Sequence, residues 1–288
     1  IASGGNYNTV VGDEAGTALT TGDSNVIVGM VAGDALTTAS DNVAVGQGAL
    51  TADTLGSKTV AIGRQALTTQ NFTSATDTYN TAVGHNAGLL VTTGASNTLI
   101  GGLAGDALTT GKQNVAIGYH ALGSDDVGQK TVAIGEGALF TQNYATATDS
   151  YNTAVGYNVG NAVTTGINNT LIGGLAGDAL TDADKNVAIG YASLTADDLG
   201  SKTVAIGTSA AGSQNYASAT DSHNTYIGHE AGFFNVTGVQ NTWVGSGAGV
   251  GASGNSNSNN VGVGYNAGND ITTGTHNTLI GGLAGDAL

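Results

Sequence analysis

The sequence predicts an all-β fold, a parallel β-solenoid (β-roll) in which 16 coils of the chain stack one on the next. The first observation is a pentapeptide, Asn-Thr/Val-x-Val/Ile-Gly, that recurs sixteen times in 288 residues. The second is its spacing, because the usual step is 17 residues and every fourth step is 21, which gives a super-repeat of 72 residues. A short fixed period is typical of chains whose coils touch only their neighbours. The pentapeptides end at Gly12, Gly29, Gly46, Gly63, Gly84, Gly101, Gly118, Gly135, Gly156, Gly173, Gly190, Gly207, Gly228, Gly245, Gly264 and Gly281.

The phasing predicts one continuous solenoid over residues 1–288. Its four super-repeats are expected at about 8–79, 80–151, 152–223 and 224–288, after an N-terminal half-coil of residues 1–7. Neither end carries an atypical polar capping repeat, which a free-standing solenoid normally needs. We therefore expect the chain to be a segment of a longer protein.

Composition excludes several classes of protein. Glycine supplies 48 residues without a collagen period, and proline and cysteine are absent, so neither a triple helix nor a disulfide framework nor a thiolate zinc site is expected. The formal net charge of −15 disfavours binding to nucleic acid and to anionic lipid, both of which need clustered Lys and Arg. No apolar run is long enough for membrane insertion. A surface rich in Gly, Asn, Thr and Ala suits an extracellular setting.

The coil itself can be read from residues 114–122. Val115 and Ile117 are two residues apart, so they share one face of a strand, and we expect this face to point into the coil. Three residues after each glycine comes alanine in all but two coils, where Val159 and Ser193 replace it. The fixed glycine indicates a backbone conformation or a close approach that a side chain would prevent.

Asparagine leads thirteen of the sixteen coils, and stacked amides are expected to form a hydrogen-bonded ladder along the column. Thr59, Thr131 and Thr203 replace it in the coil before each 21-residue step. Each threonine follows a lysine, and these lysines either decorate one exposed turn or serve a function: Lys58, Lys130 and Lys202.

The position between the two Val/Ile positions is apolar in nearly every coil. If the Val/Ile face points inward, this middle position points outward, where a lone solenoid should be polar. An apolar stripe along the surface implies a partner, and the simplest partner is another copy of the chain in a homotrimer or a filament. The self-association stripe is expected to include Leu99, Leu171, Tyr226, Trp243 and Leu279.

The run NTAVGYNVG at residues 152–160, followed by TTG at 164–166 and NTLIG at 169–173, resembles the repeats of bacteriophage tail fibres. Such arrays often precede a self-cleaving intramolecular chaperone domain. The run is also similar to the head repeats of trimeric autotransporter adhesins, but that repeat is shorter than 17 residues, so the phage-type array is the better match. Both resemblances imply a left-handed parallel β-roll that is usually trimeric.

The 21-residue steps contain a four-residue insertion that unites an aromatic residue, an aspartate and amides. This combination suits a cell-surface glycan, because an aromatic ring can stack on a sugar while polar groups bind its hydroxyls. The alternative is a structural turn whose aromatic ring folds back on the solenoid. The candidate glycan-contact residues are Phe72, Asp77, Tyr144, Asp149, Tyr216 and Asp221.

No other chemistry is indicated. Asp34, Asp106 and Asp178 follow glycine in a run that superficially resembles a calcium-binding repeat, but the spacing is wrong and each coil offers too few oxygens. The five histidines are not clustered, and no catalytic constellation can be argued. We therefore expect no metal site, no cofactor and no catalytic residue. An ice-binding face is disfavoured because Asp126 and Asp198 interrupt the row of threonine pairs.

These observations predict a structural protein rather than an enzyme. The function expected is that of a shaft in an extracellular fibre, a bacteriophage tail fibre that holds a receptor-binding tip away from the particle. The alternative is a bacterial surface adhesin or a self-assembling extracellular filament. Both place the chain on a virion or a cell surface.

Overall fold

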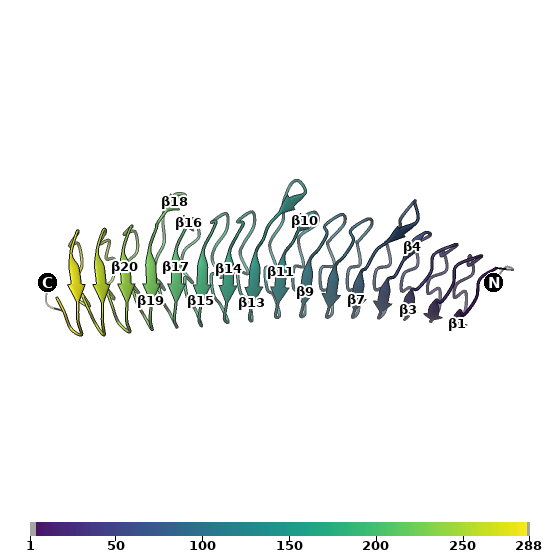
Figure 1. The fold of residues 1–288 in the computed structure, drawn as a ribbon, viewed down its shortest axis with the longest axis horizontal. Helices are drawn as coiled ribbons and strands as arrows, with labels where there is room; N and C mark the ends of the chain where they lie inside the picture. Colours follow the sequence, from purple (N-terminus) through teal and green to yellow (C-terminus); the bar gives the residue numbers. More distant parts are fainter. Residues whose placement is uncertain (1–3, 287–288) are drawn as a thin grey trace. The chain divides into compact units, whose positions relative to one another are not determined.

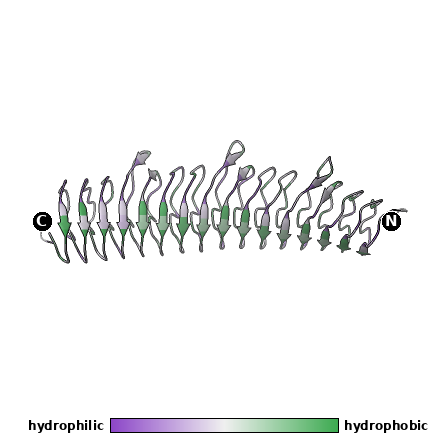
Figure 2. Cartoon of the chain, viewed as in Figure 1, coloured by the Kyte–Doolittle hydropathy of each residue, from purple (hydrophilic) through white to green (hydrophobic). Residues whose placement is uncertain are grey.

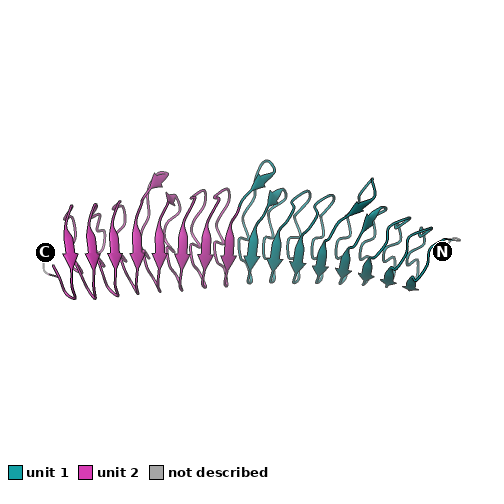
Figure 3. Cartoon of the chain, in the orientation of Figure 1, with its two compact units in different colours: residues 1–150 teal, residues 151–288 magenta. Residues whose placement is uncertain are grey.

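A computed structural model describes residues 4–286, and these residues form strands and turns without any helix. The chain divides into two units, Ile1–Ser150 and Tyr151–Leu288 (Figure 3). In each unit eight three-residue strands lie side by side, one from each coil (Figure 1). The predicted all-β parallel solenoid of 16 coils is confirmed, with eight coils in each unit. The unit boundary falls beside the predicted end of the second super-repeat, and a single continuous solenoid stays a prediction.

All neighbouring sheet strands within a unit pair in parallel, with equivalent residues opposite one another. Val115 pairs with Val132, for example, and Ile117 with Ile134. In the first unit the strands are β1 (Thr9–Val11), β2 (Val26–Val28), β3 (Val43–Val45), β5 (Val60–Ile62), β7 (Thr81–Val83), β8 (Thr98–Ile100), β9 (Val115–Ile117) and β11 (Val132–Ile134). In the second they are β13 (Thr153–Val155), β14 (Thr170–Ile172), β15 (Val187–Ile189), β17 (Val204–Ile206), β19 (Thr225–Ile227), β20 (Thr242–Val244), β21 (Val261–Val263) and β22 (Thr278–Ile280).

Three pairs of two-residue parallel strands hold the four-residue insertions. Each pair joins the third coil of a super-repeat to the 21-residue connection that follows the fourth. The pairs are β4 (Gly56–Ser57) with β6 (Thr76–Asp77), β10 (Gly128–Gln129) with β12 (Thr148–Asp149), and β16 (Gly200–Ser201) with β18 (Thr220–Asp221).

The sheet strands face the opposite way from the prediction. The middle residue of each strand points into the coil, and the two flanking residues point outward with partial exposure. Leu99, Leu171, Tyr226 and Trp243 are fully buried inside one chain, and Leu279 in the last coil is half-buried. The proposed self-association stripe is therefore wrong for these residues, because they form the interior of the solenoid.

The buried asparagine explains this reversal. Asn114 precedes its strand and is fully buried, so the period of two places Ala116 on the same inward face and leaves Val115 and Ile117 outside. A strand of three residues permits either phase, and only its flanking residues decide between them. Figure 2 shows hydrophobic colour along many of the sheet strands.

The asparagine column forms a ladder, but mainly through the backbone. The side-chain oxygen of Asn97 accepts a hydrogen bond from the backbone N–H of Asn114 at 3.0 Å, and its amide donates to the carbonyl of Gly111 at 2.9 Å. Amide-to-amide bonds along the column also occur, for example from Asn25 to Asn8 at 3.0 Å. Each asparagine thus fixes the register of the next coil and satisfies a buried carbonyl of its own coil.

The repeating glycine is required by both conformation and space. Gly118 has φ of 134°, where side chains are strained, and a Cβ there would come within 2.5 Å of the carbonyl oxygen of Gly135. Alanine three residues later is buried as predicted, for example Ala104 and Ala121.

Core volume is exchanged between the middle strand position and the turn that faces it. Where the strand supplies Leu99, the turn supplies Gly105, whose added Cβ would meet Leu99 at 2.8 Å. Where the strand supplies Ala116, the turn supplies Leu122, which is fully buried. No coil has a large side chain at both of these positions, as close packing requires.

The largest core side chain, Trp243, depends on glycines around it. A Cβ on Gly262 of the next strand would lie 2.1 Å from the indole ring. We predict that Gly262→Ala lowers the free energy of unfolding by about 1–3 kcal/mol through overpacking. Chemical denaturation would measure the change. The double variant Trp243→Leu with Gly262→Ala recreates the pair of Leu171 and Ala188 and should recover stability; if it is as unstable as Gly262→Ala alone, the clash is not the cause.

Candidate functional site

The candidate site predicted from the sequence lies on the insertions of the 21-residue steps. In the first super-repeat, β6 brings the insertion beside β4, outside the main sheet (Figure 1). The same short parallel pair recurs at β10 with β12 and at β16 with β18. The six predicted glycan-contact residues all lie on these insertions, but the structure separates the aromatic residues from the aspartates.

The aromatic residues fold back into the coil. Phe72, Tyr144 and Tyr216 are only 7, 5 and 4 % exposed. The hydroxyl of Tyr216 donates to the carbonyl of Gly238 at 2.7 Å and accepts from the amide of Asn224. Desolvation, followed by the charge of Asp197, raises the pKa of Tyr216. These rings cannot stack on a sugar, so the glycan-contact prediction is wrong for all three and the alternative of a structural turn holds.

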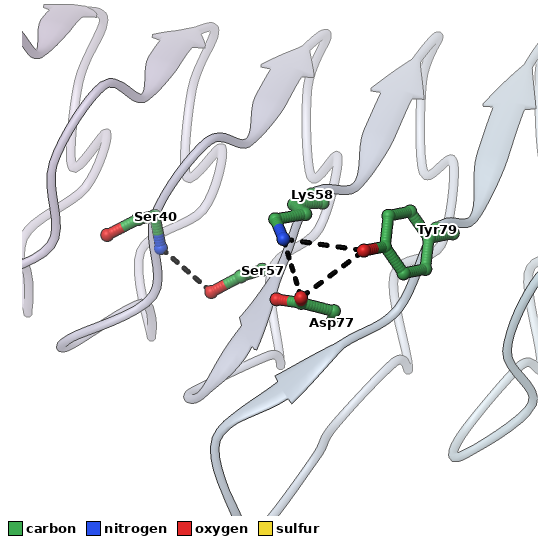
Figure 4. Close-up of polar contacts among 5 residues, drawn as sticks. All are labelled: Ser40, Ser57, Lys58, Asp77 and Tyr79. Atoms are coloured by element: carbon green, nitrogen blue, oxygen red, sulfur yellow. Dashed lines mark hydrogen bonds and ion pairs between the residues drawn. The ribbon is translucent and has the colours of Figure 1, made fainter.

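The aspartates remain at the surface, where they pair with the lysines that precede the threonines. The ammonium of Lys58 donates to Asp77 at 2.5 Å and to the hydroxyl of Tyr79 at 3.4 Å, and Tyr79 also donates to Asp77 (Figure 4). The hydrogen bond to Asp77 raises the pKa of Lys58, and the same bond lowers the pKa of Asp77.

The pairing recurs in the other super-repeats. Lys130 contacts Asp149 at 2.6 Å, and Lys202 contacts Asp221. These exposed contacts clamp each insertion to the preceding coil. In Figure 4 the Lys58 contact lies near a second link, in which the backbone N–H of Ser40 donates to the hydroxyl of Ser57 at 3.0 Å. The lysine contacts give these aspartates a structural role, and because the carboxylates stay partly exposed, their contact with a glycan stays a prediction.

A buried polar network beneath each insertion was missed in the sequence. Asp53 is fully buried and accepts hydrogen bonds from the backbone N–H of Gly56 at 3.0 Å and of Phe72 at 3.2 Å. Its other oxygen accepts from the side-chain amide of Gln70 at 2.6 Å, which also donates to Thr59. Here threonine replaces asparagine because its hydroxyl belongs to this network.

The signal for this network is a column seven residues after the repeating glycine. It reads Leu19, Leu36, Asp53 and Gln70 in the first super-repeat, and the second and third super-repeats keep Asp and Gln in their third and fourth coils: Asp125 with Gln142, and Asp197 with Gln214. Both later pairs are hydrogen-bonded, at 2.7 and 2.6 Å. An Asp followed one coil later by a Gln, in a column that is mostly leucine, valine or isoleucine, marks a buried polar pair.

Burial governs the charge of these carboxyls. Desolvation raises the pKa of Asp125 and Asp197, and hydrogen bonds from the side chains of Gln142 and Gln214 and from backbone N–H groups offset part of the shift. The hydrogen-bond donors that the structure describes at Asp197 are neutral: the side-chain amide of Gln214 and the backbone N–H groups of Gly200 and Tyr216.

Residues 4–286 contain no group of three or more His, Cys, Asp or Glu that could hold a metal ion, and no pocket. Within this range no helix has the length and apolar character needed to cross a membrane.

Comparisons with known proteins do not identify the chain. No protein-family model matches it, and no curated protein matches it. The resemblance to phage tail-fibre repeats and to adhesin heads stays a prediction based on the repeat.

The buried aspartates predict an unusual dependence of stability on pH. Their folded-state pKa lies above the unfolded value, so folding takes up protons between the two, and the free energy of unfolding falls as pH rises through this interval. Replacing both as Asp125→Asn and Asp197→Asn should flatten this fall. Urea denaturation between about pH 3 and pH 7 would measure it.

The exposed aspartates supply the matched control. Their pKa is lowered in the folded state, so their contribution is present above the unfolded pKa and is lost as pH falls through the folded one. The pair Asp77→Asn and Asp221→Asn should therefore change the profile in the opposite sense. If the two double variants shift the profile in the same direction, burial does not control the core carboxyls.

Proposed function

We propose that the chain is a structural shaft of an extracellular fibre on a virion or cell surface, of the bacteriophage tail-fibre type, which holds a receptor-binding tip away from the particle. The observation that supports this is the uniform register of the coils. Each strand hydrogen-bonds only to the strands of the coils before and after it within its unit. Coils can be added to such a stack without a new core, and length is what a shaft requires.

The outward strand residues support association with further copies of the chain. We name them the outer face: the first and third residues of every sheet strand, which are valine, isoleucine or threonine without exception. Ile100 and Ile172 are 37 and 38 % exposed. Copies of a chain with a net charge of −15 repel each other, and contact through the outer face, which carries no charge, keeps that repulsion smallest. The proposed assembly is a homotrimer or filament joined through this face.

Removing one super-repeat tests the shaft. Deleting residues 152–223 joins Tyr151 to Asn224 in phase, so the fibre should shorten by about 19 Å, four coils at about 4.8 Å each, and still fold. Electron microscopy of the particles would measure the length. The control deletion of 152–214 ends out of phase and should not fold. If the in-phase deletion collapses as well, the coils do not act as interchangeable spacers.

Charges on the outer face test self-association. Ile172→Glu with Ile189→Glu should shift the sedimentation coefficient toward that of a monomer, because each charge would have to be buried between copies. The control Ile172→Thr with Ile189→Thr uses a residue that the face already contains and should keep the assembly. A wild-type chain that sediments as a monomer at micromolar concentration would refute association through this face.

A further inference from the structure

A second surface feature, separate from both the insertions and the outer face, lies directly after the repeating glycines of the second unit. The residue that follows the glycine carries a ring in every second coil. We name these four residues the ring column: Tyr157, Tyr191, His229 and Tyr265. The tyrosines are 56, 61 and 63 % exposed, and the side chain of His229 is 58 % exposed.

The intervening coils keep this column open. They carry small residues at the same position: Gly174, Thr208, Ser246 and Gly282. A Cβ on Gly174 would lie 3.7 Å from Cδ2 of Tyr191, so the edge of the ring lies beside the glycine backbone. The first unit repeats the arrangement at Tyr119, where a Cβ on Gly102 would lie 3.6 Å from the ring.

The spacing of the rings indicates the ligand. Neighbouring strands are about 4.8 Å apart, so rings in alternate coils recur at about 9.6 Å. In an extended β-1,4-linked chain each sugar advances by a distance close to one coil step and is turned over relative to the sugar before it, so alternate sugars present the same face. A flat polysaccharide of this kind can therefore place equivalent sugars over successive rings along the column.

We propose that the ring column binds a linear, neutral, β-1,4-linked polysaccharide. The rings of Tyr157, Tyr191 and Tyr265 stack on the apolar faces of alternate sugars, as aromatic rings do with apolar surfaces. Their hydroxyls, and those of Thr208 and Ser246, bind the sugar hydroxyls between them. The net charge of −15 disfavours an anionic polysaccharide, and Glu230 lies beside His229 at 3.8 Å.

The period separates this site from the outer face. The outer face repeats in every coil, as the surface of a second copy of the chain does. The ring column repeats only in every second coil of the second unit, and this period suits a ligand whose own repeat has two parts. The proposal does not depend on the proposed shaft function.

Depletion from solution by insoluble cellulose and chitin tests the proposal on the full chain, followed by calorimetry with soluble cello- and chito-oligosaccharides. The variant Tyr191→Ser with Tyr265→Ser should weaken binding by roughly tenfold or more, because two stacking rings are lost. The matched control, Tyr79→Ser with Tyr151→Ser, removes two tyrosines that are also more than half exposed but lie before the buried asparagines, and it should bind as the wild type does.

Three results would overturn the proposal. The first is that the wild type binds neither β-linked polymer. The second is that it binds amylose, which is α-linked, or polygalacturonate, which is anionic, as well as it binds the β-linked polymers. The third is that the two double serine variants bind alike. Sedimentation of the same variants completes the test. If Tyr191→Ser with Tyr265→Ser breaks an assembly and leaves polysaccharide binding unchanged, the ring column belongs to an interface between copies.

Discussion

The buried asparagine column is the constraint on which the rest of the structure depends. The oxygen of each asparagine accepts the backbone N–H of the next coil, for example from Asn42 to Asn25 at 3.0 Å, while the amide holds the carbonyl of its own turn. An orphaned amide in this interior would cost about 1–3 kcal/mol, so a coil cannot slip without losing several such bonds. Burying the asparagine also turns the middle strand residue inward and the flanking residues outward. Register, core and surface thus follow from one side chain.

The strand and the turn of each coil share the volume of the interior. Leucine in the strand is matched by glycine in the turn, as with Leu99 and Gly105, and leucine in the turn is matched by alanine in the strand, as with Leu122 and Ala116. The third and fourth coils break this apolar pattern with a buried Asp–Gln pair. In some proteins, buried polar groups specify register rather than add stability. In a chain of near-identical coils, they mark which connection receives the insertion, and the exposed Lys58–Asp77 contact fastens that insertion from outside.

Features set by the period could be predicted from the sequence, and features set by the phase of a short strand could not. The 17-residue step, the glycine and the buried alanine follow from spacing and backbone sterics alone. The inward face could not be predicted in this way. A strand of three residues is compatible with either face pointing inward, and Val115 and Ile117 are as apolar as core residues. The prediction that the aromatic residues of the insertions contact a glycan was wrong for a related reason. Phe72 and Tyr216 sit in polar, turn-rich segments, yet each fills space beside a buried aspartate that only the column of equivalent positions reveals.

In a repeat protein each column of surface residues has its own repeat distance, and this distance decides which ligands can bind along the column. The outer face has the same pattern of valine, isoleucine or threonine in every coil. A partner whose own repeat equals one coil, above all another copy of the chain, can therefore make the same contact at each coil. The ring column skips alternate coils, and a partner that matches every coil would meet Gly174, Thr208 or Ser246 at half of its contacts. Association between copies and binding of a two-part polymer therefore make different demands on the surface. The coil can meet both because the residues before and after the repeating glycine lie outside the core, where the first keeps a uniform apolar row and the second varies from coil to coil.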